Sequence, residues 1–152
     1  FAFYKISATI HEKVYQLMTQ QQAVLSREAD LPRADRGNGA STTRLVNRSC
    51  GSQSMINGIT TIPPKGAIPL HYHNCEESVL VLSGTGSAVV GEIELAVKTG
   101  DVTWIPANLP HQFRNRSDTD SMRIFWTYAS AGATRTIVET GETHLIDSEH
   151  KA

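Results

Sequence analysis

The stretch Gly66–Gly84, GAIPLHYHNCEESVLVLSG, decides how the rest of the sequence is interpreted. Alternate residues of a β-strand point to the same face of the sheet, so His71 and His73 would place two imidazoles side by side, roughly 6–7 Å apart along the strand. Glu77 has the same parity and opens the next apolar run. Two imidazoles and a carboxylate on one face form a ligand set suited to a divalent transition metal.

A second stretch, 100–115, GDVTWIPANLPHQFRN, supplies a candidate for a fourth ligand. In this stretch His111 follows a short apolar run and a turn that contains two prolines. The sequence therefore predicts a metal site made of His71, His73, Glu77 and His111. The alternative is a metal-free barrel in which these histidines are polar core residues with hydrogen-bond partners.

The composition limits the classes of protein that the chain can belong to. Its 152 residues suffice for one domain with a core, and 39% of them are hydrophobic. The net charge is -1 with scattered Lys and Arg, which argues against a nucleic-acid partner. No apolar run approaches the roughly 20 residues of a membrane helix. Two cysteines make no disulfide framework, so a cytoplasmic location is expected.

The first 40 residues are predicted to form an N-terminal helix and loop. Apolar residues recur at spacings of mostly three and four between about Ser7 and Glu28, which is typical of an amphipathic helix. The segment 30–41 carries Pro, Asp, Gly and Asn and is expected to be a loop. A second possibility is that the natural protein starts at Met18, so that residues 1–17 do not belong to it.

From residue 41 to 146 the sequence consists of short β-type runs separated by turns, and 147–152 is expected to be a polar tail. Gly84 and Gly100 punctuate the ends of runs, where a positive φ is often needed. About ten short strands without helical interludes predict an all-β fold, an antiparallel sandwich or barrel.

The two stretches together resemble the two motifs of the cupin superfamily. His71-Tyr72-His73, Glu77 and Gly84 follow the spacing of its first motif. Gly100, Pro106, His111 and Asn115 follow that of the second motif. Two positions depart from the pattern. Gly66 lies one residue closer to the histidines than usual, and Asn108 replaces a glycine, although Asn tolerates left-handed backbone geometry well.

The resemblance implies a small single-domain cupin (a monocupin), that is, a jelly-roll barrel also described as an antiparallel double-stranded β-helix. It further implies one divalent transition metal, Fe, Mn, Ni, Cu, Co or Zn, bound by His71, His73, Glu77 and His111. Homodimers that pair through their sheets are common in this family, and Leu80 and Leu82 would face away from the metal toward such a partner. Cys75 lies between the ligands but has the opposite parity.

Parity also predicts which side chains line the pocket around the metal. Val79 and Val81 share the face of Glu77, Phe113 shares that of His111, and Trp126 or its neighbour Phe125 faces inward from a late strand. For the strand before the first motif two registers remain open, one with Met55, Asn57 and Ile59 inward and one with Ile56 and Gly58 inward. The preferred pocket consists of Met55, Ile59, Val79, Val81, Phe113 and Trp126.

Three functions fit this site. The preferred one is a metal-dependent enzyme, a non-haem dioxygenase-type oxidoreductase, acting on a small oxygenated organic molecule, as the resemblance to cupin dioxygenases implies. The second is a non-oxidative isomerase, cyclase, lyase or decarboxylase that uses the metal as a Lewis acid. The third is a small-molecule-binding cupin without catalysis. The sequence shows no separate general base, and Glu77 is the candidate for proton transfer.

Overall fold

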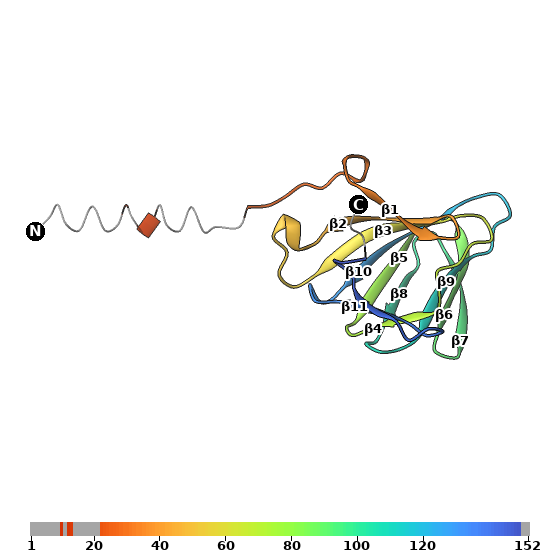
Figure 1. The fold of residues 1–152 in the computed structure, drawn as a ribbon. Coiled ribbons are helices and arrows are strands. Elements are labelled where there is room, and N and C mark those ends of the chain that lie inside the picture. Colours follow the sequence, from red (N-terminus) through yellow and green to blue (C-terminus); the bar gives the residue numbers. More distant parts are fainter. Residues whose placement is uncertain (1–9, 11, 14–21, 150–152) are drawn as a thin grey trace, which may run out of the picture.

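The computed structural model describes residues 10, 12–13 and 22–149 of the chain. Two antiparallel six-stranded sheets face each other and enclose the core (Figure 1). The first sheet has the order β1-β2-β3-β10-β5-β8. It consists of β1 (Arg33–Gly37), β2 (Ala40–Val46), β3 (Ile56–Ile62), β10 (Met122–Tyr128), β5 (Glu77–Ser83) and β8 (Val102–Ile105).

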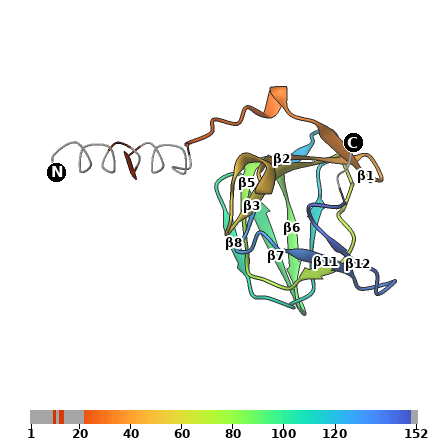
Figure 2. The same cartoon turned by 60° about the vertical axis from the view of Figure 1, so that its left-hand side comes forward.

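The second sheet has the order β12-β11-β4-β9-β6-β7, and Figure 2 labels β11 and β12 at its edge. It consists of β12 (Thr143–Leu145), β11 (Thr134–Ile137), β4 (His71–His73), β9 (His111–Asn115), β6 (Thr85–Val90) and β7 (Ile93–Lys98). Neighbouring strands in each sheet are often distant in sequence, as expected of a jelly roll. The all-β prediction is therefore confirmed.

The predicted N-terminal helix falls largely on residues 1–9, 11 and 14–21, which lie outside the described part of the chain. Of the residues that the structure does describe there, Ile10, Glu12 and Lys13 are helical, whereas 22–27 have no regular secondary structure. Two short 3-10 turns, Glu28–Asp30 and Arg48–Cys50, complete the elements. Within the described residues, no helix is long and apolar enough to cross a membrane.

The predicted loop at 30–41 is wrong, because β1 and β2 form a hairpin there. Gly37, Asn38 and Gly39 all have positive φ and make the turn. The ladder loses register between Asp35 and Gly37, so Arg36 lies in a β-bulge. Bulges change the direction in which a side chain points, which matters for the position of Arg36 described below.

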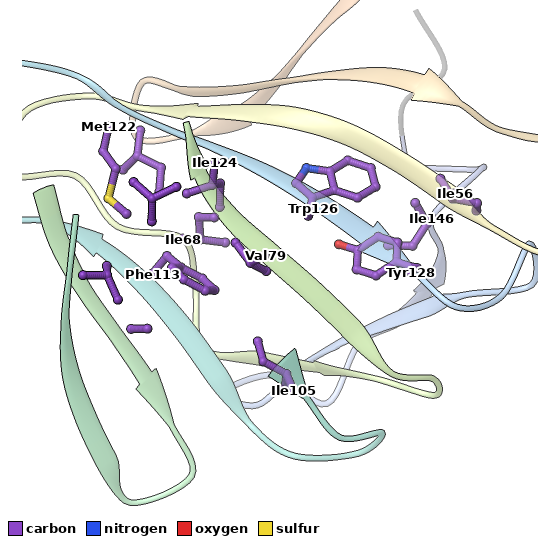
Figure 3. Close-up of a cluster of buried hydrophobic side chains, with 14 of the residues drawn as sticks. Ile56, Ile68, Val79, Ile105, Phe113, Met122, Ile124, Trp126, Tyr128 and Ile146 are labelled. Atoms are coloured by element: carbon purple, nitrogen blue, oxygen red, sulfur yellow. The ribbon is translucent and has the colours of Figure 1, made fainter. Parts of the chain in front are cut away.

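The core lies between the two sheets and is supplied mainly by alternate residues of the central strands. In β10 and β3 the buried residues occur at every second position, as the period of a half-buried strand requires. Figure 3 shows Met122 at one end of this cluster and Trp126 and Tyr128, next to Ile56 and Ile146, at the other. The metal-ligand candidates lie at the Tyr128 end, since Tyr128 pairs with Glu77.

Candidate metal centre

The four predicted ligands come together between the sheets. His71 and His73 flank Tyr72 in β4, and His111, which pairs with His71, begins β9 of the same sheet. Glu77 begins β5 in the opposite sheet. All four residues are buried, and their ligand atoms lie within 4.8 Å of one another. Side chains from both sheets thus converge on one point in the interior.

Backbone carbonyls fix the tautomer of each histidine. The Nδ1–H of His71 donates to Pro69 O at 2.7 Å, that of His73 to Thr134 O at 2.8 Å, and that of His111 to Leu109 O at 2.9 Å. Because a carbonyl can only accept, the proton of each neutral ring is on Nδ1. The lone pair of each ring is then on Nε2, which is the arrangement that metal-binding imidazoles use.

The atoms that point to the centre have no hydrogen-bond partner. Among the described residues four buried side-chain polar atoms lack one, and three of them are His73 Nε2, Glu77 Oε2 and His111 Nε2. The fourth, Oδ1 of Asn57, lies elsewhere in β3. Buried polar atoms without partners are costly, each by about 1–3 kcal/mol. Three of them aimed at one point therefore fit a cation at that point.

Two distances support this interpretation. Glu77 Oε2 lies 2.8 Å from His111 Nε2 and 3.6 Å from His73 Nε2, yet none of these atoms forms a hydrogen bond of acceptable geometry. The imidazole rings are also close to one another, and the ring centroids of His71 and His111 are 4.4 Å apart. Side chains that bind the same metal ion approach each other without forming hydrogen bonds to each other. The four residues could therefore hold one divalent transition metal.

Burial changes the protonation of the site in the absence of metal. Burial lowers the pKa of His71 well below its usual value, and the neighbouring His111 and His73 lower it further. The pKa of His73 is lowered for the same main reason, although Glu77 opposes the effect. Burial also lowers the pKa of His111, but the adjacent Glu77 carboxylate outweighs it and raises that pKa overall. His71 and His73 are thus kept neutral, as metal ligands must be.

The loop before His111 is anchored to the ligand strand. Asn108, which replaces the glycine of the second motif, has a φ of 62°, so the left-handed turn is retained. Its backbone N–H donates to His73 O at 2.7 Å and ties the loop to β4. Asn115, at the end of the same motif, donates through Nδ2 to the carbonyls of Ile62, Pro63 and Asp120. Asn115 therefore closes a turn and is not part of the site.

A cavity of about 20 Å³, room for about one water molecule, lies next to the ligands. Phe113 and Trp126 line it, whereas Val79 and Val81 are buried in the core without lining it. The prediction of Met55 and Ile59 is corrected. Met55 is 45% exposed and Ile59 lies on the outer face, because β3 takes the other register with Ile56 and Gly58 inward. The cavity is lined by Arg36, Thr60, Ile68, His71, Glu77, His111, Phe113, Ile124, Trp126, Tyr128 and Ile146.

Six lining residues were not predicted from the sequence, and two of them, Tyr128 and Arg36, bring a phenol and a positive charge to the cavity. The ring of Tyr128 lies 4.3 Å from that of His73 and is stacked on Trp126 at 4.7 Å. The alternation that places Trp126 inward would also have identified Tyr128, two residues later. Arg36 gave no such signal, because its segment was expected to be a loop.

Cys75 is a free, half-buried thiol that packs against the core outside the ligand group. Burial is the main cause of its raised pKa, and the charge of Glu77 adds to the effect. A raised pKa disfavours the thiolate, which is the form that binds metals and reacts. This agrees with the opposite parity of Cys75 in the sequence.

A larger groove, of about 650 Å³, lies outside the barrel between the segment 24–35 and β2. It contains none of the four ligand candidates and is lined by both acidic and basic residues. Glu149, near the C-terminal end of the described chain, lies on its wall. The chemistry therefore belongs to the small cavity, and the groove lies beside it.

Comparisons with known proteins define the family of this chain. Residues 58–128 match the sequence model of the cupin domain. Protein SchB from Streptomyces halstedii is 30% identical over 109 residues, which cover 71% of this chain and 79% of SchB. The chain therefore belongs to the cupin family, as a single small cupin domain.

More distant similarities extend to plant and bacterial proteins. Auxin-binding protein 1 from Arabidopsis thaliana is 28% identical over 103 residues, and the match covers 60% of this chain but only 52% of that protein. Among solved structures, the polyketide cyclase RemF from Streptomyces resistomycificus has a TM-score of 0.66 at 16% identity, covering 82% of this chain and 86% of RemF. At this identity the structural likeness shows the fold alone.

Proposed function

We propose that this cupin is a metal-dependent enzyme that moves protons on a small oxygenated organic substrate, in the class of isomerases, cyclases and lyases. The observation that carries the proposal is the convergence of three histidines and Glu77 beside a buried tyrosine hydroxyl. A divalent metal held by the four side chains would supply a Lewis acid that polarises a carbonyl or enol oxygen. The remaining requirement is a group that holds or moves a proton.

Tyr128 is the best candidate for this group. It pairs with Glu77 across β10 and β5 and lines the cavity. Burial, followed by the charge of Glu77, raises the pKa of Tyr128 well above its usual value. Its hydroxyl therefore stays protonated at neutral pH and can donate a hydrogen bond or a proton to a substrate oxygen.

Glu77 is the complementary candidate. Of the described residues that line the cavity, it is the only carboxylate, and its Oε2 has no hydrogen-bond partner. We expect it to hold the metal and, in addition, to accept a proton from the substrate. Tyr128 and Glu77 would then form a donor and an acceptor on one wall of the cavity.

The name of one structural neighbour suggests a reaction within the proposed class. RemF is described as a polyketide cyclase, and the match covers 86% of RemF. The aromatic walls formed by Phe113, Trp126 and Tyr128 suit an unsaturated or aromatic substrate. Cyclisation of a molecule that carries several carbonyl groups is thus one reaction within the proposed class.

A non-haem dioxygenase is the second candidate. Its supporting observation is the ligand set itself, since imidazole and carboxylate ligands accommodate redox-active Fe, Mn, Ni and Cu as well as Zn. The apolar wall would also protect reactive species from water. Oxygen consumption separates the two candidates directly.

The test combines metal analysis with turnover assays on a panel of ketones, 1,3-diketones and catechols. We expect bound metal, solvent deuterium incorporation into a ketone substrate and no substrate-dependent oxygen uptake. Tyr128→Phe should keep the metal and lower turnover by about 10²-fold or more. Tyr72→Phe is the matched control, because Tyr72 points away from the ligands in the same strand as His71 and His73.

Three results would contradict the proposal. Stoichiometric oxygen uptake would replace it with the dioxygenase. Full activity in Tyr128→Phe would remove the tyrosine from the reaction. Small-molecule binding without turnover for any substrate of the panel would favour a binding protein.

A further inference from the structure

Arg36 brings a positive charge to the wall of the metal cavity. It lies in the β-bulge of β1, opposite the buried part of β2, and its side chain is only 11% exposed. It lines the cavity together with His71, Glu77 and His111. Of the described residues that line the cavity, Arg36 is the only Arg or Lys, so the cationic group on that wall is a single guanidinium.

Glu149 holds Arg36 from the other side. Arg36 Nη1 lies 3.4 Å from Glu149 Oε2, and the Glu149 side chain is 7% exposed. The same carboxylate accepts a shorter bond, 2.9 Å, from Nε of Arg135 in β11. One carboxylate is thus shared by two guanidinium groups, and the contact with Arg135 is the tighter one.

The Arg36–Glu149 pair separates two spaces. Arg36 lines the cavity of about 20 Å³, and Glu149 lines the outer groove of about 650 Å³. The cavity has room for about one water molecule, so an organic substrate requires additional space. We expect a displacement of Glu149 from Arg36 to open the cavity toward the groove, while Arg135 keeps its contact with Glu149.

We propose that Arg36 binds the carboxylate of an acidic substrate, and that Glu149 occupies the position of this carboxylate until the substrate arrives. The substrate would enter through the outer groove, and its carboxylate would replace Glu149 on Arg36. Its carbonyl group would then face His71, Glu77 and His111. This inference rests on the proposed function and narrows its substrates to small organic acids that carry a carbonyl group.

A guanidinium suits this role for two reasons. It presents a planar fork that binds a carboxylate through two parallel hydrogen bonds. It also keeps its charge in a buried position, so the exchange of one carboxylate for another needs no change of protonation. A neutral analogue of the substrate could not replace Glu149 and would bind more weakly.

The test compares acetoacetate with its neutral methyl ester as probes, using the full chain loaded with zinc and calorimetric titration. We expect the wild-type protein to bind acetoacetate at least about tenfold more tightly than the ester, as one hydrogen-bonded charge pair provides. Arg36→Gln should abolish this preference, and Arg36→Lys should reduce it. Arg116→Gln is the control, because Arg116 is exposed and lines neither the cavity nor the groove.

Glu149→Gln tests the exchange of carboxylates separately from the carboxylate site on Arg36. Loss of the competing carboxylate should tighten acetoacetate binding and leave binding of the ester unchanged. This result does not depend on how well the Arg36 variants fold. Weaker acetoacetate binding in Glu149→Gln would show that Glu149 only positions Arg36 and would overturn the exchange.

Zinc content is measured on the same samples. An Arg36→Gln protein that binds zinc and still prefers acetoacetate would contradict the carboxylate site while leaving the proposed function intact. A wild-type protein that binds no zinc or other divalent metal would contradict the proposed function. In that case, a preference for acetoacetate that Arg36→Gln removes would still support the carboxylate site.

Discussion

The two ends of the barrel interior are equally buried but satisfied in different ways. At one end Ile62 and Met122, which pair across β3 and β10, are completely buried within the apolar cluster. At the other end His71, His73, Glu77 and His111 bring polar atoms into the interior, and three of these atoms have no partner. The first end is stabilised by packing, whereas the second requires a cation that the chain itself does not supply.

This difference indicates that the apolar end stabilises the fold and that the ligand end serves the function. The apolar end gains free energy from the burial of hydrophobic surface, about 25 cal/mol per Å². The ligand end loses free energy until a cation satisfies its atoms. Substitutions at the two ends should therefore fail in different ways, and four predictions test this.

The largest effect is expected from His111→Ala. Removing a ligand should lower metal affinity by more than the 10–100-fold that is typical for residues that only orient ligands. The rise in melting temperature on adding metal should disappear with it. Competition with a chelator measures the affinity, and His144→Ala, which changes an exposed histidine, should behave like the wild type.

Ile62→Ala should destabilise the apolar end of the barrel. Ile62 is completely buried, so its truncation should lower the free energy of unfolding by about 2–5 kcal/mol. Metal affinity of the folded variant should stay the same, because the ligands lie at the opposite end. Urea unfolding measures the loss, and Ile93→Ala, at a position 61% exposed, should cost far less. A large loss of metal affinity in folded Ile62→Ala would mean that the two ends are not independent.

The pH dependence of the metal-free protein should come from the ligand end. The pKa of His71 is lowered by burial, so below about pH 6.5 the unfolded chain binds more protons than the folded one. The free energy of unfolding should therefore be highest above this pH, as far as His71 determines it, and should fall as the pH drops. For this histidine the loss is at most about 1.4 kcal/mol at pH 5.5.

His73 should act in the same direction, and His111, whose pKa is raised, in the opposite one. The measurement is urea unfolding in the presence of a chelator at pH 7.5 and 5.5. A His71→Asn variant should show a smaller dependence. An unchanged dependence in that variant would exclude His71 as its source.

The smallest effect concerns the loop that leads to His111. Asn108→Ala should cost about 1 kcal/mol, because alanine tolerates the positive φ at this position poorly. Asn108→Gly should restore most of the stability. Thermal unfolding of the two variants tests this, and equal melting temperatures would show that the turn adapts to either residue.

The ligand end was more predictable from the sequence than its surroundings. His71, His73 and Glu77 lie within seven residues, so strand alternation and the spacing of the motif suffice to group them. Tyr128 was missed although the alternation from Trp126 leads to it. Its role depends on the pairing of β10 with β5, which is a contact between distant segments.

The strands at the margins were less predictable. β3 carries isoleucines at 56, 59 and 62, so both of its faces contain apolar residues and parity could not choose between them. The composition of 30–41 predicts a loop where β1 and β2 form a hairpin, although Asn38-Gly39 is a known hairpin signal. Arg36 was lost with it, since its position depends on the pairing of β1 with β2 and on a bulge.

The most direct test of the account is the stoichiometry and coordination of metal in protein purified without added metal. Elemental analysis should find one divalent transition metal ion per chain, and X-ray absorption should show imidazole nitrogen and carboxylate oxygen ligands without sulfur, as expected for His71, His73, His111 and Glu77. A chain without bound metal, or a sulfur ligand from Cys75, would contradict the assignment of this end of the barrel as a metal centre.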